Sequence, residues 1–150
     1  MPPISFPIGY CLVTDSFRKE LESSGLRGLA FATVLKHHIV ELHWEDWDRT
    51  KELEPWQLPE SGPEGYLLDH PHSPETAAAM DDLWLLTPPG LPHVWDGTRA
   101  YFERSVVGDN DFFFMLSSSG SQQFASPRAK EWLEQRVAEW ITFEPFAIVD

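Results

Sequence analysis

Two segments of the chain carry the same pattern of apolar and polar positions. They are residues 12–34 and residues 124–146, which match without a gap at a constant offset of 112 residues. Each begins with apolar residues, continues into an amphipathic stretch with apolar positions about four residues apart, and ends in alternating apolar residues. The first spacing is typical of a helix and the second of a strand. The alternating residues are Leu29 and Phe31 in the first block and Ile141 and Phe143 in the second. We therefore predict strand, helix and strand twice, as a candidate internal repeat.

Hydroxyl residues mark the start of each predicted helix. Thr14 and Ser126 precede the two amphipathic stretches, where their side chains can accept a hydrogen bond from a backbone N–H of the first turn. Gly25 can take the left-handed conformation that ends the first helix. Ser126 is followed by Pro127 and Ser73 by Pro74, and proline is tolerated at the first position of a helix. Ser73 therefore predicts a third, short helix over residues 76–83.

The remaining apolar runs predict strands. Residues 36–44 alternate between apolar and polar side chains. Residues 99–107 and 111–116 form two β-rich runs around Gly108, Asp109 and Asn110, a turn signal that predicts a hairpin. Strands and helices then alternate without a strict βαβ order. The predicted fold is α+β, a single domain over residues 1–150 with one mixed or mostly antiparallel sheet and two or three helices packed on it.

Residues 45–72 interrupt this pattern. They hold four prolines and two glycines, a spacing that excludes a helix or a central strand of useful length. Long ordered loops carry function more often than short ones do. We expect a long acidic surface excursion here.

The composition excludes several classes of protein. The single cysteine, Cys11, lies in an apolar run, so a disulfide scaffold and a thiolate metal site are excluded and a core position is expected. The longest apolar run, residues 112–116, is too short to cross a bilayer. The first base is Arg18, so the N-terminus lacks the charged region of a signal peptide and we expect a cytoplasmic protein. No nucleophile or phosphate-binding motif occurs, and we expect neither an enzyme nor a cofactor.

Acidic residues are concentrated in the middle of the chain. The net charge is −13, and no base occurs between Lys51 and Arg99. That stretch holds nine acids: Glu52, Glu54, Glu60, Glu64, Asp69, Glu75, Asp81, Asp82 and Asp96. Such a field disfavours nucleic acid and attracts a basic protein. The alternative is a solvated face that keeps the protein soluble.

Large aromatic residues are interleaved with acids at the start of the excursion. Tryptophan is enriched at the centres of protein interfaces, and surrounding charges of one sign suit a partner of the other sign. The candidate partner-binding residues are Trp44, Glu45, Asp46, Trp47, Asp48, Glu52, Glu54 and Trp56. The alternative is that Trp44 closes a core strand, Trp47 packs under the loop and the acids are merely solvated.

Two histidines suggest a different chemistry. His70 and His72 would share one face of an extended segment, with Asp69 and Glu75 close by, and imidazole with carboxylate is plausible zinc or iron chemistry. Pro71 lies between them, and no HExxH helix is present. A small metal-dependent hydrolase is therefore kept as the alternative function, and a dimerising scaffold or regulator as a third.

The two similar blocks also resemble a known family. The second block, FASPRAKEWLEQRVAEWITFEPF, resembles the closing signature of bacterial immunity proteins encoded beside polymorphic toxins: an apolar strand, Ser, a charged helix and a Gly-Φ-x-Phe-x-Pro strand. The first block keeps that glycine as Gly28, whereas the second has Trp140. The resemblance implies a cytoplasmic α+β protein without catalytic residues that binds and blocks a cognate toxin. The matched positions are structural, so no functional residue follows from it.

Overall fold

A computed structural model describes residues 2–7, 9–41, 67–116 and 122–150. The chain divides into two compact units, which are Met1–Val34 with Asp82–Asp150 (unit 1) and Leu35–Asp81 (unit 2). That residues 1–150 make a single domain stays a prediction.

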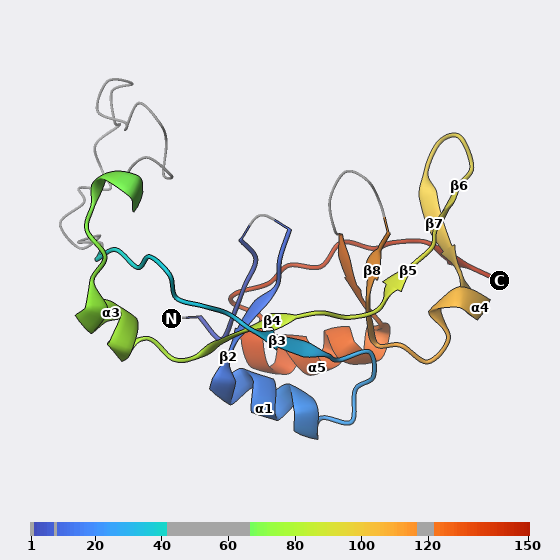
Figure 1. The fold of residues 1–150 in the computed structure, drawn as a ribbon. Coiled ribbons are helices and arrows are strands. Elements are labelled where there is room, and N and C mark those ends of the chain that lie inside the picture. The colour runs from blue at the N-terminus through green and yellow to red at the C-terminus, as the bar shows by residue number, and fades with distance from the viewer. Residues whose placement is uncertain (1, 8, 42–66, 117–121) are drawn as a thin grey trace, which may run out of the picture. The chain divides into compact units, whose positions relative to one another are not determined.

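The first sheet of unit 1 has four antiparallel strands in the order β1-β2-β4-β3. Their bounds are Ile4–Ser5 (β1), Leu12–Thr14 (β2), Phe31–Thr33 (β3) and Leu83–Leu86 (β4). The central strand β4 receives β2 on one side and β3 on the other, so that Trp84 lies between Val13 and Thr33 (Figure 1). All four residues of β4 are apolar and none is exposed, as suits a strand whose two faces are both covered.

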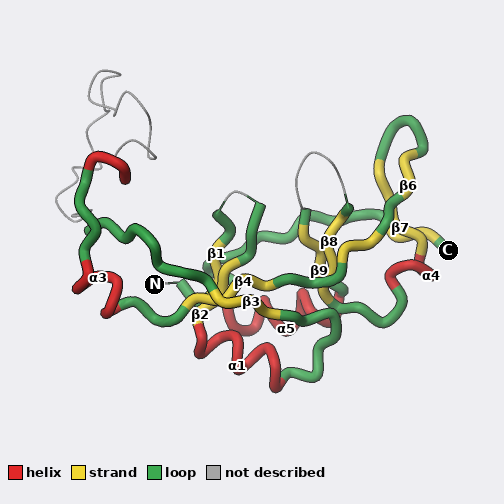
Figure 2. Tube along the Cα trace, in the orientation of Figure 1, coloured by secondary structure: helices red, strands yellow, loops and turns green. Residues whose placement is uncertain are grey.

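Two smaller mixed sheets complete the strands of unit 1. One has the order β10-β7-β6, and the other has the order β5-β8-β9. Their bounds are Gly90–Leu91 (β5), Val94–Trp95 (β6), Ala100–Glu103 (β7), Phe112–Met115 (β8), Gln123–Ala125 (β9) and Ile148–Val149 (β10). β10 pairs with β7, and β5 with β8, in parallel, while the other pairs are antiparallel. Figure 2 shows the described strands in yellow.

Among its described residues, unit 1 has three helices, α1 (Asp15–Ser23), α4 (Arg104–Val107) and α5 (Pro127–Val137). The predicted caps are confirmed: the hydroxyl of Thr14 accepts from the N–H of Phe17 at 3.3 Å, and that of Ser126 accepts from the N–H of Ala129 at 3.1 Å. Each bond satisfies a backbone donor of the first turn that would otherwise lack a partner.

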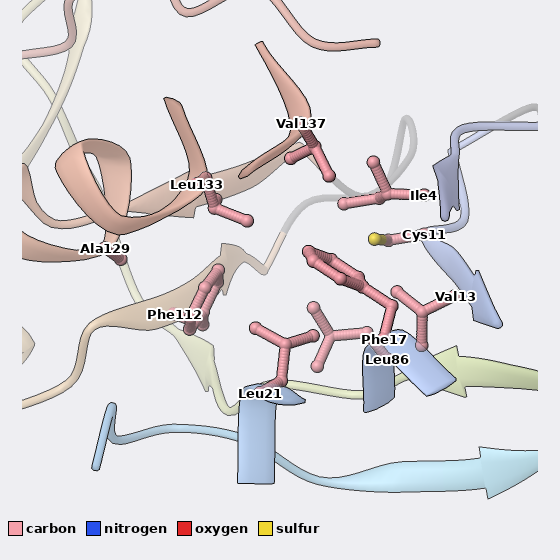
Figure 3. Close-up of a cluster of buried hydrophobic side chains, with 10 residues drawn as sticks. All are labelled: Ile4, Cys11, Val13, Phe17, Leu21, Leu86, Phe112, Ala129, Leu133 and Val137. Carbon is pink, nitrogen blue, oxygen red and sulfur yellow. The ribbon is translucent and has the colours of Figure 1, made fainter. Parts of the chain in front are cut away.

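The larger core of unit 1 lies between the two long helices and the strands. Phe17 and Leu21 of α1 point toward Leu133 and Val137 of α5, since apolar positions four residues apart share one helix face (Figure 3). The buried residues are Ile4, Cys11, Val13, Phe17, Leu21, Leu86, Phe112, Ala129, Leu133 and Val137. Cys11 is buried, as predicted.

A second buried cluster lies beside the smaller sheets. It consists of Phe102, Val107, Phe113 and Met115. Phe102 makes edge-on ring contacts with Phe113 and Phe124, both at 5.1 Å between centroids. Rings in this arrangement stabilise each other beyond the area they bury. The apolar run that begins at Phe112 therefore serves two cores, because alternate residues of β8 face opposite sides.

Unit 2 contains α3 (Pro74–Ala79) and residues 35–41, which belong to no helix or strand. The predicted cap of this helix is confirmed, since the hydroxyl of Ser73 accepts from the N–H of Thr76 at 3.2 Å. The helix is shorter than predicted: it ends at Ala79, not at residue 83. Leu83 instead begins β4, where the ladder with its two neighbours outweighs the local helical pattern.

The predicted hairpin of residues 99–107 and 111–116 is wrong. β7 ends at Glu103 and pairs with β6 and β10, while β8 pairs with β5 and β9. Between them, residues 104–107 form α4, and Gly108 follows this helix with φ of 55° instead of turning a hairpin. β7 thus pairs with the strand just before it and with the C-terminal strand, and β8 pairs with the strand just after it and with β5, but the two do not pair with each other.

Two predicted strands are not formed. Residues 36–41, the described part of the strand predicted over 36–44, join no ladder. The strand predicted around Ile141 and Phe143 is also absent, and pairing resumes only at β10. The fold class is nevertheless confirmed as α+β, although the described strands form three small sheets rather than one. Within the described ranges, no helix has the length and apolar character needed to cross a membrane.

Candidate functional site

The aromatic and acidic segment predicted to bind a partner falls outside the described residues. This applies to all of its members: Trp44, Glu45, Asp46, Trp47, Asp48, Glu52, Glu54 and Trp56. The structure does describe the chain on both sides of it, namely residues 35–41 and 67–81 of unit 2. The surroundings of the predicted site can therefore be described from these two segments and from the acidic residues that follow them.

The segments that flank residues 42–66 are hydrogen-bonded to each other. The backbone N–H of Ser73 donates to the carbonyl of Ile39 at 2.7 Å, and the N–H of Ile39 donates to Nδ1 of His72 at 3.0 Å. Nε2 of His38 donates to the carbonyl of Leu67 at 2.7 Å and lies 3.0 Å from that of His70. Backbone and imidazole hydrogen bonds therefore hold the two flanking segments together.

Lys36 adds a further link between the same two segments. Its ammonium donates to the carbonyls of Ala77 and Met80, at 2.8 and 2.9 Å. These carbonyls end α3, where unpaired acceptors and the helix dipole favour a cation. Lys36 thus caps α3 from the segment that precedes the excursion.

These bonds give His72 a structural role. Its Nδ1 already accepts the Ile39 N–H, so that only Nε2 could bind a metal. His38, His70 and His72 come from the two flanking segments, and the rings of His38 and His72 lie 6.1 Å apart. Among the described residues, no group of three or more His, Cys, Asp or Glu side chains is placed to hold a metal ion.

The described acids of the base-free stretch all lie at the surface. They are Asp69, Glu75, Asp81, Asp82 and Asp96. Asp96 holds its own turn: the hydroxyl of Thr98 donates to it at 2.7 Å, as do the N–H groups of Arg99 and Thr98. These bonds favour the ionised carboxylate and lower the pKa of Asp96 to about 2. The negative charge predicted from the sequence is thus presented to solvent wherever the chain is described.

A hollow of about 370 Å³ lies in unit 1 between α1, β3 and β4. Arg18 of α1 stacks on the indole of Trp84, 4.3 Å from the ring centroid. Its guanidinium also donates to Asp15 at 2.9 Å and to Glu22 at 2.6 Å, so two carboxylates pair with this one cation. Leu26, Leu29, Ala30 and Phe31 supply the apolar part of the lining. The buried indole Nε1 of Trp84 has no hydrogen-bond partner among the residues that the structure describes.

Asp111 joins three parts of unit 1. Its buried carboxylate accepts from the N–H of Arg27 at 2.8 Å, from the hydroxyl of Ser126 at 2.6 Å, and from Arg128. Burial by itself would raise the pKa of Asp111, but the bonds from Arg128, Ser126 and Arg27 outweigh it and the pKa is lowered. The carboxylate fixes the start of α5 to the loop after α1, which is a structural role.

The pattern of the sequence did not reveal the hollow or the role of Asp111. Arg18 and Trp84 are 66 residues apart, so no spacing rule connects them. Asp111 stands just before the apolar run of β8, and an acid in that position is the one local sign of a buried, paired carboxylate. The chain matches no family model, no curated protein and no solved structure. Its function must therefore be argued from its own residues.

Proposed function

We propose that this protein binds a cognate bacterial toxin domain and neutralises it by covering the toxin's active site. The acidic, tryptophan-containing segment of residues 44–56 makes the contact. One observation carries the proposal: 47 consecutive residues, 52–98, contain nine acids and no base. Every member of this set that the structure describes is exposed, which supports its use as a surface for a basic partner.

The mechanism is occlusion assisted by charge. A protein of net charge −13 accelerates its encounter with a cationic surface and repels nucleic acid and other anions. Toxins that act on nucleic acid or nucleotides need a basic active site, so the same field that guides binding also covers that site. Indoles at the centre of the contact would supply most of the affinity. The proposal places the protein in the cytoplasm, as the resemblance to immunity proteins implies.

The metal-dependent hydrolase has weaker support. His72 already uses one ring nitrogen to hold Ile39, and Nε2 of His38 is engaged by the carbonyl of Leu67. Metal analysis of the purified protein separates the two functions, since stoichiometric zinc or iron would favour the hydrolase.

The proposal is tested with a double variant, Asp46→Lys with Trp47→Ala. Loss of one anchor and reversal of one charge should weaken binding to the toxin encoded next to this gene by at least roughly 30-fold, the size of a single interface hot spot. Affinity is measured at low ionic strength, and growth is measured on co-expression with the toxin.

A matched control makes the same changes elsewhere. Glu139→Lys with Trp140→Ala likewise removes one indole and reverses one adjacent charge, here at two exposed residues that follow α5. The control should bind as the natural protein does. If the Asp46/Trp47 variant keeps full affinity, or both variants lose it equally, the assignment of the site to residues 44–56 is wrong.

A further inference from the structure

β3 is an edge strand with an unusual composition. It lies at one end of the sheet β1-β2-β4-β3, and its residues Ala32 and Thr33 are exposed. The surrounding stretch Leu29–Val34 reads LAFATV and contains no charged residue, proline or glycine. Proteins normally protect such edges, because a bare row of backbone donors and acceptors invites another strand.

The other edge strands of unit 1 do carry such protection. Each of β1, β5, β6, β9 and β10 has a proline or a charged residue within two residues of its ends. Those residues are Pro3, Pro89, Asp96, Pro127 and Asp150, in the same order of strands. β3 is the exception among the described edges, which indicates that its edge is kept available for pairing.

The register of the sheet fixes which backbone groups face outward. The N–H of Thr87 donates to the carbonyl of Ala30 at 2.8 Å, and that of Val34 donates to the carbonyl of Leu83 at 3.2 Å. Bonded and non-bonded pairs alternate along an antiparallel ladder, so Ala32 also bonds inward to β4. The N–H and C=O groups of Phe31 and Thr33 therefore point away from β4, and no described residue of unit 1 bonds to them.

The hollow beside α1 adjoins this edge. Leu29, Ala30 and Phe31 belong both to the edge stretch and to the lining of the hollow. Arg18 and Glu22 also line the hollow, and their side chains are bonded to each other at 2.6 Å. The edge thus offers backbone pairing next to a hollow whose apolar walls continue from β3.

We propose that β3 is a docking edge for an extended, basic segment of a partner protein, which adds to the sheet as a fifth strand. Strand addition of this kind draws affinity from the backbone and specificity from alternate side chains. Charge selects the occupant: a second copy of the chain would bring another 13 negative charges, whereas a basic segment is attracted. The inference does not require the partner to be a toxin.

The test uses a defined peptide and a proline substitution. Fluorescein-labelled Lys-Val-Lys-Val-Lys-Val-Lys should bind the full-length protein at least about tenfold more tightly than the same peptide with Glu in place of Lys. Thr33→Pro removes an outward N–H and leaves the bonds to β4 intact, so it should weaken the lysine peptide about tenfold. Thr33→Val keeps the N–H and should bind within about twofold of the natural protein. Binding is followed by fluorescence anisotropy.

Amide hydrogen exchange gives a second measurement that needs no variant. The amides of Phe31 and Thr33 should exchange quickly in the free protein and become protected when the lysine peptide binds. Equal binding of the two peptides, equal binding by Thr33→Pro, or no binding at all would overturn the proposal. So would amides that are already protected in the free protein, because another part of the chain or a second copy would then cover the edge. Loss of toxin binding in the Asp46→Lys, Trp47→Ala variant concerns the segment of residues 44–56. It does not change what these peptide and exchange measurements say about β3.

Discussion

The two similar blocks, residues 12–34 and 124–146, fold alike in their first half and differ in their second. Each has a strand, a hydroxyl cap and a helix, and the helices bury equivalent residues, Leu21 and Leu133, in one core. Even the surface pairs correspond, since Arg18 to Glu22 and Lys130 to Glu134 both measure 2.6 Å. After the helix, the first block turns into β3, but the second stays outside any ladder until β10.

Gly28 accounts for part of this difference. It has φ of 81°, and a Cβ built on it would lie 2.2 Å from the carbonyl oxygen of Phe112. The equivalent residue in the second block is Trp140, whose side chain could not occupy such a position. A local pattern is thus sufficient for the capped helix, while a close backbone contact decides whether a strand follows it.

The largest expected effect concerns the shared half of the blocks. Leu21→Ala and Leu133→Ala each remove a nearly fully buried side chain from the same core. Each should lower the free energy of unfolding by about 3 to 4 kcal/mol, through lost burial and the cavity left behind. Urea denaturation of both variants measures this. A small loss in one and a large loss in the other would show that the two helices are not equivalent in the core.

The next effect concerns the half that differs. Gly28→Ala should cost about 2 to 3 kcal/mol, because left-handed backbone strain adds to the clash with Phe112. Gly25→Ala is the matched control, since its φ is 74° but nothing lies within 4 Å of a new Cβ. It should cost about 1 kcal/mol, the strain alone. Thermal unfolding of the two variants under identical conditions measures the difference, and equal losses would remove the role given to Gly28.

A smaller effect is expected at the link between the blocks. Asp111→Asn replaces the carboxylate that joins Arg27 of the first block to Ser126 and Arg128 of the second. It should cost about 2 kcal/mol at neutral pH, the value of bonds to a charged group. Because the folded pKa of Asp111 is lowered, this stability is present above the ordinary aspartate pKa of about 4 and is lost as the pH falls through the folded value. The urea midpoints of the variant and the natural protein should therefore converge at low pH, and a constant difference between pH 7 and pH 3 would contradict the role of the carboxylate.

The sequence was sufficient for those parts of the fold that local chemistry determines. The three caps at Thr14, Ser73 and Ser126 were predicted and are formed, because a side chain and an N–H three residues away decide them. The buried position of Cys11 followed from its apolar neighbours. The pairing of strands did not follow, since β7 and β8 were predicted to pair with each other, yet β7 pairs with β6 and β10 and β8 pairs with β5 and β9, which buries Phe102 and Phe113.

The candidate site divides in the same way. The exposure of acids such as Asp69 and Glu75 could be expected from their charge alone. The imidazole bonds of His38 and His72 could not, because they depend on which two segments lie together in unit 2. The free edge of β3 was also hidden, since a strand is known to be an edge only when the order of the whole sheet is known.

The lone thiol of the core gives this protein a built-in reporter. Cys11 is the single cysteine of the chain, and burial raises its pKa to about 12. A maleimide reagent needs the thiolate and access to it, and the folded state supplies neither. The rate of alkylation therefore counts how often the core opens, at one known position and without any engineered label. The same chemistry reads stability inside a living cell, with and without the binding partner.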